Sequence, residues 1–248
     1  MNATSTLNEE PILAGRTIEK RYGRLLVLDS VEFSVGPGSA VGIVGPNGAG
    51  KTTLLDVLAG AQPPTSGAVF FRGRDITATG AAHRSRSGIG RTHQVPRPFG
   101  AMTVFENVYV GATAGGGLRG SAAYERAISV LDLCGLLSLA NRRASSLGLL
   151  HRKRLELARA LAAGPEVLLL DEIGGGLTDA EADELLLTIK RLRKQGIAIV
   201  WIEHIVHVLV QAVDRLVCMD AGRVIADGLP EEVLRDAKVI DAYLGRRE

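Results

Sequence analysis

A glycine-rich segment at residues 45–52 has the residue types and the spacing to bind phosphate groups. It matches G-x-x-x-x-G-K-[ST] without a gap and lies between an apolar run and a helical pattern. Glycines let successive backbone N–H groups converge on phosphate oxygens, and the helix beginning near Lys51 adds its positive dipole end. We expect Lys51 to reach the β- and γ-phosphates of a nucleotide and Thr52 to offer its hydroxyl to Mg²⁺. The candidate binding residues are Gly45, Pro46, Asn47, Gly48, Ala49, Gly50, Lys51, Thr52 and Thr53.

An acidic pair, Asp171 and Glu172, follows a run of four apolar residues at 167–170. Such a run indicates a buried parallel strand, whose carboxyl end lies at the same sheet edge as the phosphate-binding loop. We therefore expect Asp171 to hold Mg²⁺ through water and Glu172 to act as the general base on the attacking water. The alternative is that the pair only begins a helix, where the dipole favours acids. The strand before the pair favours the catalytic interpretation.

The elements that position these residues follow from the hydrophobic pattern. Continuous apolar runs at 40–44, 167–170 and 197–201 predict parallel strands buried on both faces, and thus a doubly wound α/β sheet. Alternating β-favouring residues over 14–35 predict antiparallel strands with a turn near residues 22–23. The sheet edge at the ends of the parallel strands is the predicted site.

Helical periodicity dominates between about residues 95 and 162, which we interpret as an inserted helical lobe. Within it, the glycine-rich tract 111–120 is expected to be a loop. The whole domain is predicted to span 10–248 and to close with two strands and a helix begun by Pro230. Residues 1–9 are expected to be a disordered tail.

The composition limits the classes of protein to which this chain can belong. A chain of 248 residues can bury a full core, and its two cysteines are too few for a disulfide framework or a metal site. The formal net charge of +2 offers no field that would attract nucleic acid, so we expect no such partner. The polar N-terminus lacks the features of a secretion signal, and the apolar stretch 196–213 contains Glu203, His204 and His207, which argues against a membrane span. We expect a chain that is soluble when isolated.

Nearly the whole chain resembles the ATP-binding subunits of ABC transporters, beyond the two motifs above. Gln94 falls where that family has its Q-loop glutamine, which contacts Mg²⁺ and reports to the membrane subunit. His204 falls at the switch histidine that contacts the γ-phosphate, and Tyr22 at the aromatic residue that stacks on adenine. Each of these residues alone has an ordinary structural explanation: Gln94 as a surface residue, His204 as a core histidine and Tyr22 as a strand-packing residue. Their order and spacing favour the functional interpretation.

The resemblance implies a fold, ligands and a family of functions. The fold is an α/β P-loop NTPase (RecA-like) parallel-sheet core with an N-terminal antiparallel β subdomain and an inserted α-helical subdomain, and the ligands are ATP and Mg²⁺. The closest likeness is to the branched-chain or hydrophobic amino-acid uptake (Liv-type) subfamily, which also includes urea and amide importers. It rests on the segments 91–99, 103–108 and 201–204 and on the ending Ala242-Tyr243-Leu244-Gly245.

The same resemblance implies partners and a location. The chain would power import as a peripheral subunit at the cytoplasmic face of the inner membrane, with integral-membrane permeases and a second ABC ATPase subunit. An extracytoplasmic solute-binding protein would take part indirectly. Two alternatives stay open: a weakly catalytic regulatory nucleotide-binding subunit, and an ABC ATPase outside transport.

The family signature near L-S-G-G-Q is altered. Gly148 lacks the serine hydroxyl, and Leu150 puts a side chain where glycine lets the backbone approach phosphate, although His151 could compensate in part. Because this segment would complete the site of the other subunit, we expect a heterodimer with unequal sites, with a homodimer as the alternative. Residues 173–177 also lack the usual proline after Glu172. The altered signature consists of Leu147, Gly148, Leu149, Leu150 and His151.

Restoring glycine at position 150 tests this interpretation. The isolated chain is expected to hydrolyse ATP slowly, and a Leu150→Gly variant should turn over several-fold faster because backbone N–H groups regain access to phosphate. Steady-state phosphate release measures the change. A variant no faster than the unmodified chain would contradict the idea.

Overall fold

The antiparallel sheet is formed by the N-terminal strands. The computed structural model describes residues 10–244, so the predicted tail at 1–9 and residues 245–248 of the predicted domain lie outside the described residues. The strand order is β2-β1-β4-β5, and β1 pairs with β2 across a turn at Gly23, as predicted. The strands are β1 (Leu13–Tyr22), β2 (Leu25–Val35), β4 (Ser66–Phe71) and β5 (Arg74–Asp75).

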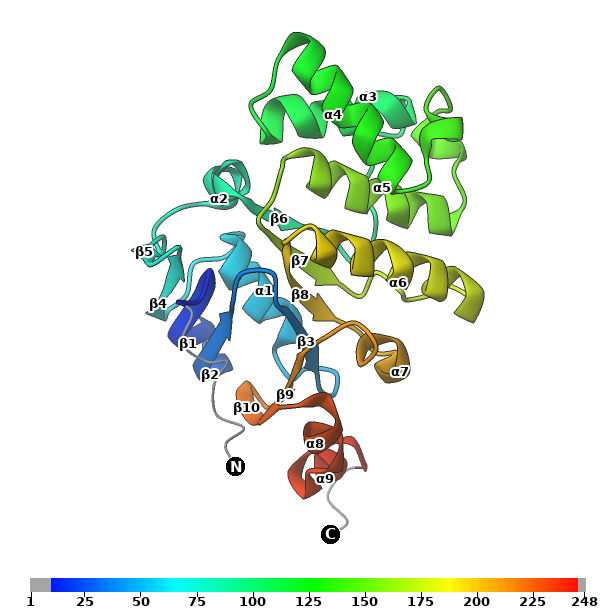
Figure 1. Cartoon of the computed structure of the whole chain (residues 1–248). Coiled ribbons are helices and arrows are strands. Elements are labelled where there is room, and N and C mark those ends of the chain that lie inside the picture. The colour runs from blue at the N-terminus through cyan, green and yellow to red at the C-terminus, as the bar shows by residue number, and fades with distance from the viewer. Residues whose placement is uncertain (1–9, 245–248) are drawn as a thin grey trace, which may run out of the picture.

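A second sheet carries the strands that the apolar runs predict. Its order is β10-β9-β3-β8-β7-β6, with β9, β3, β8, β7 and β6 parallel and β10 antiparallel to β9. Figure 1 shows this sheet running through the middle of the molecule. The strands are β3 (Ala40–Val44), β6 (Ile89–Arg91), β7 (Val167–Asp171), β8 (Ala198–Ile202), β9 (Arg215–Asp220) and β10 (Arg223–Gly228).

The parallel strands are apolar throughout because each of their faces meets a different core. Along β7, Leu168 and Leu170 pack into a core shared with the helices that follow, whereas Val167 and Leu169 pack into a core shared with the antiparallel sheet and α1 (Lys51–Ala59). Side chains alternate between the faces of a strand, so a strand covered on both faces needs apolar residues at every position.

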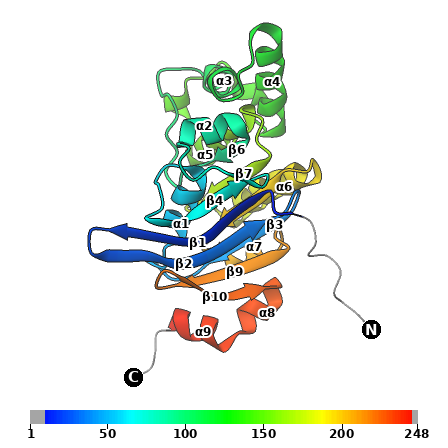
Figure 2. The ribbon, with the colours of Figure 1, turned by 90° about the vertical axis from the view of Figure 1, so that its left-hand side faces the viewer.

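A group of helices lies beside the parallel sheet, with α3 and α4 at the top of Figures 1 and 2 and α5 below them, next to the sheet. It comprises α3 (Val104–Val110), α4 (Gly120–Leu133) and α5 (Leu149–Ala162), with short 3₁₀ turns at Leu137–Leu139 and Ala144–Ser146. A capping box between Thr103 and Glu106 begins α3. These helices occupy the region predicted to be helical, and the lobe limits of 95 and 162 stay a prediction.

The glycine-rich tract 111–120 is a loop only over residues 116–119, whereas its composition predicts a loop throughout. Residues Gly111–Gly115 form a π-helical turn that continues α3, and α4 begins at Gly120. A Cβ at Gly111 would lie 2.6 Å from the Arg159 carbonyl oxygen. Glycine here therefore serves close packing of the π-helical turn against α5, a role that local sequence cannot distinguish from loop flexibility.

The remaining helices flank the sheets. They are α2 (Ala81–Ser87), α6 (Asp179–Lys194), α7 (Val206–Leu209), α8 (Pro230–Arg235) and α9 (Ala237–Leu244). Pro230 begins α8 as predicted, and the chain then turns into α9. Over residues 10–244, the structure contains no helix with the length and apolar character needed to cross a bilayer.

A buried arginine holds the carboxyl end of α1, the helix that follows the phosphate-binding loop. Arg84 on α2 is 1% exposed, and burial lowers the pKa of its guanidinium to about 10. The guanidinium donates to carbonyl groups in the last turn of α1 and in the segment after β5, which ties α2 to both of these segments. The acceptors are the carbonyl oxygens of Val57, Leu58, Ile76, Thr77 and Thr79.

Removal of this guanidinium should destabilise the fold. Arg84→Met is expected to lower the free energy of unfolding by about 3 kcal/mol because the carbonyls of Leu58, Thr77 and Thr79 lose their donor. Arg84→Lys should lose less, since it keeps the charge but not the planar fork. Urea denaturation measures both, with Arg86→Met, exposed on the same helix, as the matched control. Equal effects of the two methionine variants would contradict the role of Arg84.

Candidate active site

The phosphate-binding loop lies between the end of β3 and the start of α1, as the motif requires. Gly45 has φ 144°, and a side chain there would collide with the Met219 carbonyl oxygen on β9. Gly50 is the N-cap of α1, in the left-handed conformation. The loop is therefore shaped by backbone conformations that favour glycine, and its N–H groups precede a helix N-terminus.

Lys51 is folded back onto its own loop. Its side chain is 6% exposed, and Nζ donates to the carbonyl oxygens of Gly45 at 2.7 Å and Pro46 at 2.9 Å. Burial lowers the pKa of the ammonium group, against the opposing charges of Glu172 and Asp171. An entering phosphate would take the place of these two carbonyl acceptors.

Asp171 and Thr52 lie side by side, in the arrangement that the acidic pair predicts. The Thr52 hydroxyl donates to Oδ1 of Asp171 over 3.4 Å. Asp171 is 2% exposed, and burial raises the pKa of its carboxyl group while Arg91 opposes that shift.

These two oxygens fit a hard divalent cation. Over the described residues 10–244, no cluster of three His, Cys, Asp or Glu could bind a metal by itself. A cation here would rely on one hydroxyl, one carboxylate and the phosphates of its nucleotide, which is the way Mg²⁺ commonly binds.

Glu172 is the point where three predicted site residues meet. Its Oε1 lies 2.6 Å from Nε2 of His204, and its Oε2 accepts a hydrogen bond from Nε2 of Gln94 at 2.5 Å. Its backbone is left-handed, with φ 48°, a conformation that costs free energy for a residue other than glycine and that clusters at active sites. The ends of β6, β7 and β8 thus bring Gln94, Glu172 and His204 together.

Tyr22 lies at the end of β1, outside this cluster. Its side chain is 46% exposed, and the Lys20 ammonium lies 5.1 Å from its ring centroid. The ring is therefore open to stacking by a ligand, and the adenine role of Tyr22 stays a prediction.

The altered signature segment begins helix α5. Gly148 is the N-cap and has no side chain that could cap the helix. Leu147 before it is buried in the core, and Leu149 after it is 46% exposed. Leu150 and His151 are half-buried in the first turn of the helix. The helix N-terminus that the family uses for phosphate is present here without a hydroxyl of its own.

The structure adds three charged residues that the sequence interpretation did not single out. Arg91 pairs with both Asp56 and Asp171. The Glu203 carboxylate accepts from the Gly174 N–H at 2.5 Å, and burial raises the pKa of this carboxyl group. Lys153 on α5 donates to the Glu172 carbonyl oxygen at 3.2 Å. Arg91 and Glu203 lie in the segments 91–99 and 201–204 that carry the family resemblance. Their closeness in sequence to Gln94 and His204 could have indicated a place at the site.

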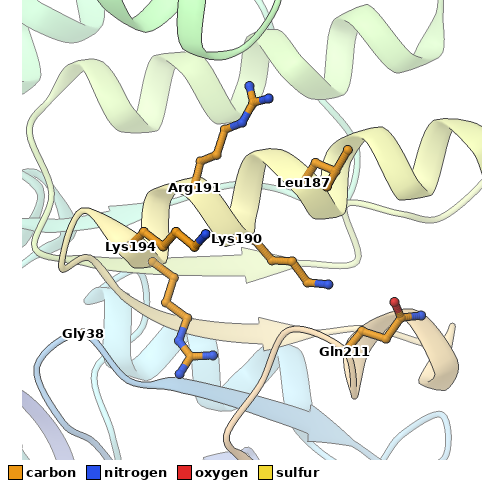
Figure 3. Close-up of a pocket in the computed structure, with 7 residues that line it drawn as sticks. Gly38, Leu187, Lys190, Arg191, Lys194 and Gln211 are labelled. Atoms are coloured by element: carbon orange, nitrogen blue, oxygen red, sulfur yellow. The ribbon is translucent and has the colours of Figure 1, made fainter.

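A cleft of about 600 Å³ lies elsewhere, along the carboxyl-terminal half of α6 (Figure 3). Its lining contains no carboxylate, histidine, thiol or hydroxyl side chain. Cations in the last turn of a helix are favoured by its dipole, so the basic character of the cleft has a structural explanation. The lining residues are Gly38, Leu187, Lys190, Arg191, Arg193, Lys194 and Gln211.

Comparisons with known proteins agree with this geometry. Residues 28–174 match the family model described as ABC transporter, and residues 223–248 match the model described as branched-chain amino acid ATP-binding cassette transporter. The chain is 36% identical to the high-affinity branched-chain amino acid transport ATP-binding protein LivG of Salmonella typhimurium, over 95% of this chain and 98% of that protein. It is 34% identical to the corresponding protein BraF of Pseudomonas aeruginosa, over 95% and 98% of the two chains.

Solved structures give the same result. A nucleotide-free ATP-binding cassette from an ABC transporter superposes with a TM-score of 0.87 at 31% identity, covering 96% of this chain and all of that one. An ATP-binding cassette of an ABC transporter in its ADP conformation superposes with a TM-score of 0.86 at 32% identity, with the same coverage.

Neutralising Glu172 tests the general-base assignment. A Glu172→Gln variant should lose about 10²–10⁴-fold in turnover because the amide cannot accept the proton of the attacking water. Binding of Mg·ATP should persist, since the loop is intact. The measurements are steady-state phosphate release and calorimetric titration, with Glu232→Gln, exposed on α8, as control. Unchanged turnover in Glu172→Gln would remove the assignment.

Proposed function

The chain belongs to the ABC transporter family of ATPases, and we propose that it powers an importer of branched-chain or other hydrophobic amino acids. As a member of that family it binds and hydrolyses ATP. The observation that carries the catalytic part is the convergence of Gln94, Glu172 and His204 at the sheet edge beside the phosphate-binding loop. The cargo proposal rests on relatives named for branched-chain amino acid transport and on the match over 223–248. Urea or another amide is the alternative cargo.

Residues 45–53 would bind the phosphates. Lys51 would leave the Gly45 and Pro46 carbonyls and turn its ammonium group to the β- and γ-phosphates, which offer it full negative charges in place of dipoles. The exposed ring of Tyr22 would stack on the adenine. Thr52, Asp171 and Gln94 would hold Mg²⁺, and that cation, when bound, neutralises part of the phosphate charge.

Glu172 would orient and deprotonate the attacking water. Gln94 and His204 each contact one of its carboxylate oxygens, and each oxygen keeps a second lone pair that can accept from water. His204 is the natural group to move because the γ-phosphate is its expected partner. A shift of His204 to the γ-phosphate would leave Glu172 freer to accept the proton of the attacking water.

A membrane partner would dock beside Gln94. Val95, Phe99 and Met102 follow Gln94 and are 66%, 45% and 38% exposed, which favours a docking surface. Of the other apolar residues that the sequence offers for it, Val104 is buried and Phe105 packs against the core, so these two belong to the lobe core instead. The Arg159 guanidinium lies 4.8 Å from the Phe99 ring centroid and donates to the Arg97 carbonyl at 2.7 Å, which fixes the surface against α5. We propose that a permease helix packs here and that the chain lies peripherally at the cytoplasmic face of the membrane.

A second ATPase subunit would complete the site. The α5 N-terminus that would face its phosphates offers Gly148 without a hydroxyl and a partly exposed Leu150. The site completed by this chain should therefore stabilise transition-state charge less well than the site completed by an intact signature. We infer a heterodimer with unequal sites, and a solute-binding protein that meets the permeases rather than this chain.

The same observation supports a second candidate function. A chain whose signature serves its partner poorly would act mainly as a regulatory nucleotide-binding subunit. The assembled cluster around Glu172 opposes this candidate, because a purely regulatory subunit has no need of a general base.

Reconstitution tests the proposed function. The chain, its co-purified permeases and the second ATPase subunit, placed in proteoliposomes with the solute-binding protein, should import radiolabelled leucine at the expense of ATP. Labelled urea is the control cargo, and uptake of urea but not leucine would redirect the cargo proposal. Hydrolysis without uptake of either solute would contradict import of these cargoes.

A charge on the docking surface tests the coupling. Phe99→Asp should abolish uptake while sparing ATP hydrolysis by the isolated chain, since aspartate disrupts an apolar contact outside the catalytic cluster. Leu187→Asp, at an exposed leucine on α6, is the matched control and should retain uptake. Equal loss of hydrolysis and uptake in Phe99→Asp would favour a core role for Phe99.

A further inference from the structure

The last described helix of the chain reaches the phosphate-binding loop. The Tyr243 hydroxyl on α9 accepts a hydrogen bond from the Gly45 N–H at 2.8 Å, across 198 residues of sequence. Tyr243 belongs to the ending Ala242-Tyr243-Leu244-Gly245, which the catalytic roles above do not use. The contact joins an otherwise unexplained motif to the first residue of the nucleotide site.

The backbone of Gly45 is held at both its N–H and its carbonyl group. Its N–H is bound by Tyr243, and its carbonyl oxygen is bound by the Lys51 ammonium group at 2.7 Å. It also lies so close to the Met219 carbonyl that a side chain would not fit. The contact with Lys51 ends when its ammonium group turns to phosphate, whereas the contact with Tyr243 does not depend on Lys51.

The position of Tyr243 is set by the core. Val233 on α8 and Val239 on α9 are each 3% exposed and belong to the core that includes Cys218 on β9. Cys218 pairs in register with Val44, the residue before Gly45. The C-terminal helices are thus anchored on the strand beside the loop, and Figures 1 and 2 show them next to β10 at that end of the sheet.

The hydroxyl remains neutral under ordinary conditions. Burial raises the pKa of Tyr243 above its usual range, although the ring is still 49% exposed. The group therefore accepts the Gly45 N–H as a phenol with its proton in place. Replacement by phenylalanine removes this one interaction and leaves the ring to pack as before.

We propose that Tyr243 is a positioning residue that preorganises the phosphate-binding loop for nucleotide, which makes the C-terminal helix α9 a determinant of ATP and ADP affinity. The inference rests on the proposed binding of phosphates by residues 45–53. Without the hydroxyl, the first residue of the loop becomes more mobile once Lys51 leaves Gly45. Nucleotide binding must then order this residue, which weakens affinity. Loss of the hydroxyl should therefore weaken nucleotide binding without slowing the chemical step, because Tyr243 contacts no reacting group.

The competing explanation is that Tyr243 only docks α9. In that case the loss of the hydroxyl would lower stability without a specific effect on the loop. The two explanations differ in the split between KM and kcat and in the hydrogen exchange of the Gly45 amide. Both measurements are made on the full chain.

The test compares Tyr243→Phe with the unmodified chain. The Kd for Mg·ADP and the KM for ATP should each rise about three- to tenfold, the range expected for one hydrogen bond, with kcat unchanged within about twofold. The Gly45 amide should exchange faster in nucleotide-free protein, while the amides of the α6 core keep their protection. Tyr124→Phe, at an exposed tyrosine on α4, is the matched control and should match the unmodified chain in every measurement.

The outcomes distinguish the positioning role of Tyr243 from the proposed function of the chain. Unchanged Kd and unchanged Gly45 exchange in Tyr243→Phe, with normal binding by the unmodified chain, would overturn the positioning role and leave the proposed function standing. A uniform loss of stability with an unchanged Kd would assign Tyr243 to helix docking and would also overturn it. Failure of the unmodified chain to bind Mg·ADP would overturn both proposals.

Discussion

The common edge at which parallel strands end is the constraint on which the site depends. Strands β3, β8, β7 and β6 are paired in one register, so their carboxyl ends meet along one line. The phosphate-binding loop follows β3, the acidic pair ends β7, His204 follows β8 and Gln94 follows β6. Groups that lie far apart in the chain become neighbours because the strands before them are hydrogen-bonded and buried on both faces.

The site also keeps several charges out of water, and each charge has a compensating partner. Lys51 is bound by loop carbonyls, Asp171 faces Arg91, and Glu203 accepts backbone N–H groups. Burial shifts the pKa values of Lys51, Asp171 and Glu203 in the direction that disfavours charge. Such groups interact strongly with a charged ligand because little water screens them, and they are already oriented before it arrives.

The two ends of α5 serve different purposes. Its buried body ties the helical group to the sheet, and Lys153 in its first turns donates to the Glu172 carbonyl. Its N-terminus points its dipole outward without the hydroxyl that the family offers to phosphate. A side chain at Gly176, in the segment after Glu172, would contact Leu149 at this N-terminus. The altered signature and the glycine-rich segment after the general base are therefore neighbours, and their departures from the family pattern belong to one surface.

The sequence by itself determined the local parts of this protein. The phosphate-binding loop, the strands at 40–44 and 167–170, and the antiparallel hairpin could be predicted because each depends on residues adjacent in the chain. In the glycine-rich tract 111–120 the loop prediction was right for residues 116–119 and wrong for residues 111–115, because glycine marks close packing as well as flexibility and only the neighbouring α5 distinguishes the two. Only the tertiary structure decided that Arg91 neutralises Asp171, that Gln94 and His204 share the Glu172 carboxylate, and that Tyr243 binds Gly45. These contacts depend on strand order and on how the helices pack, which no local pattern of residues encodes.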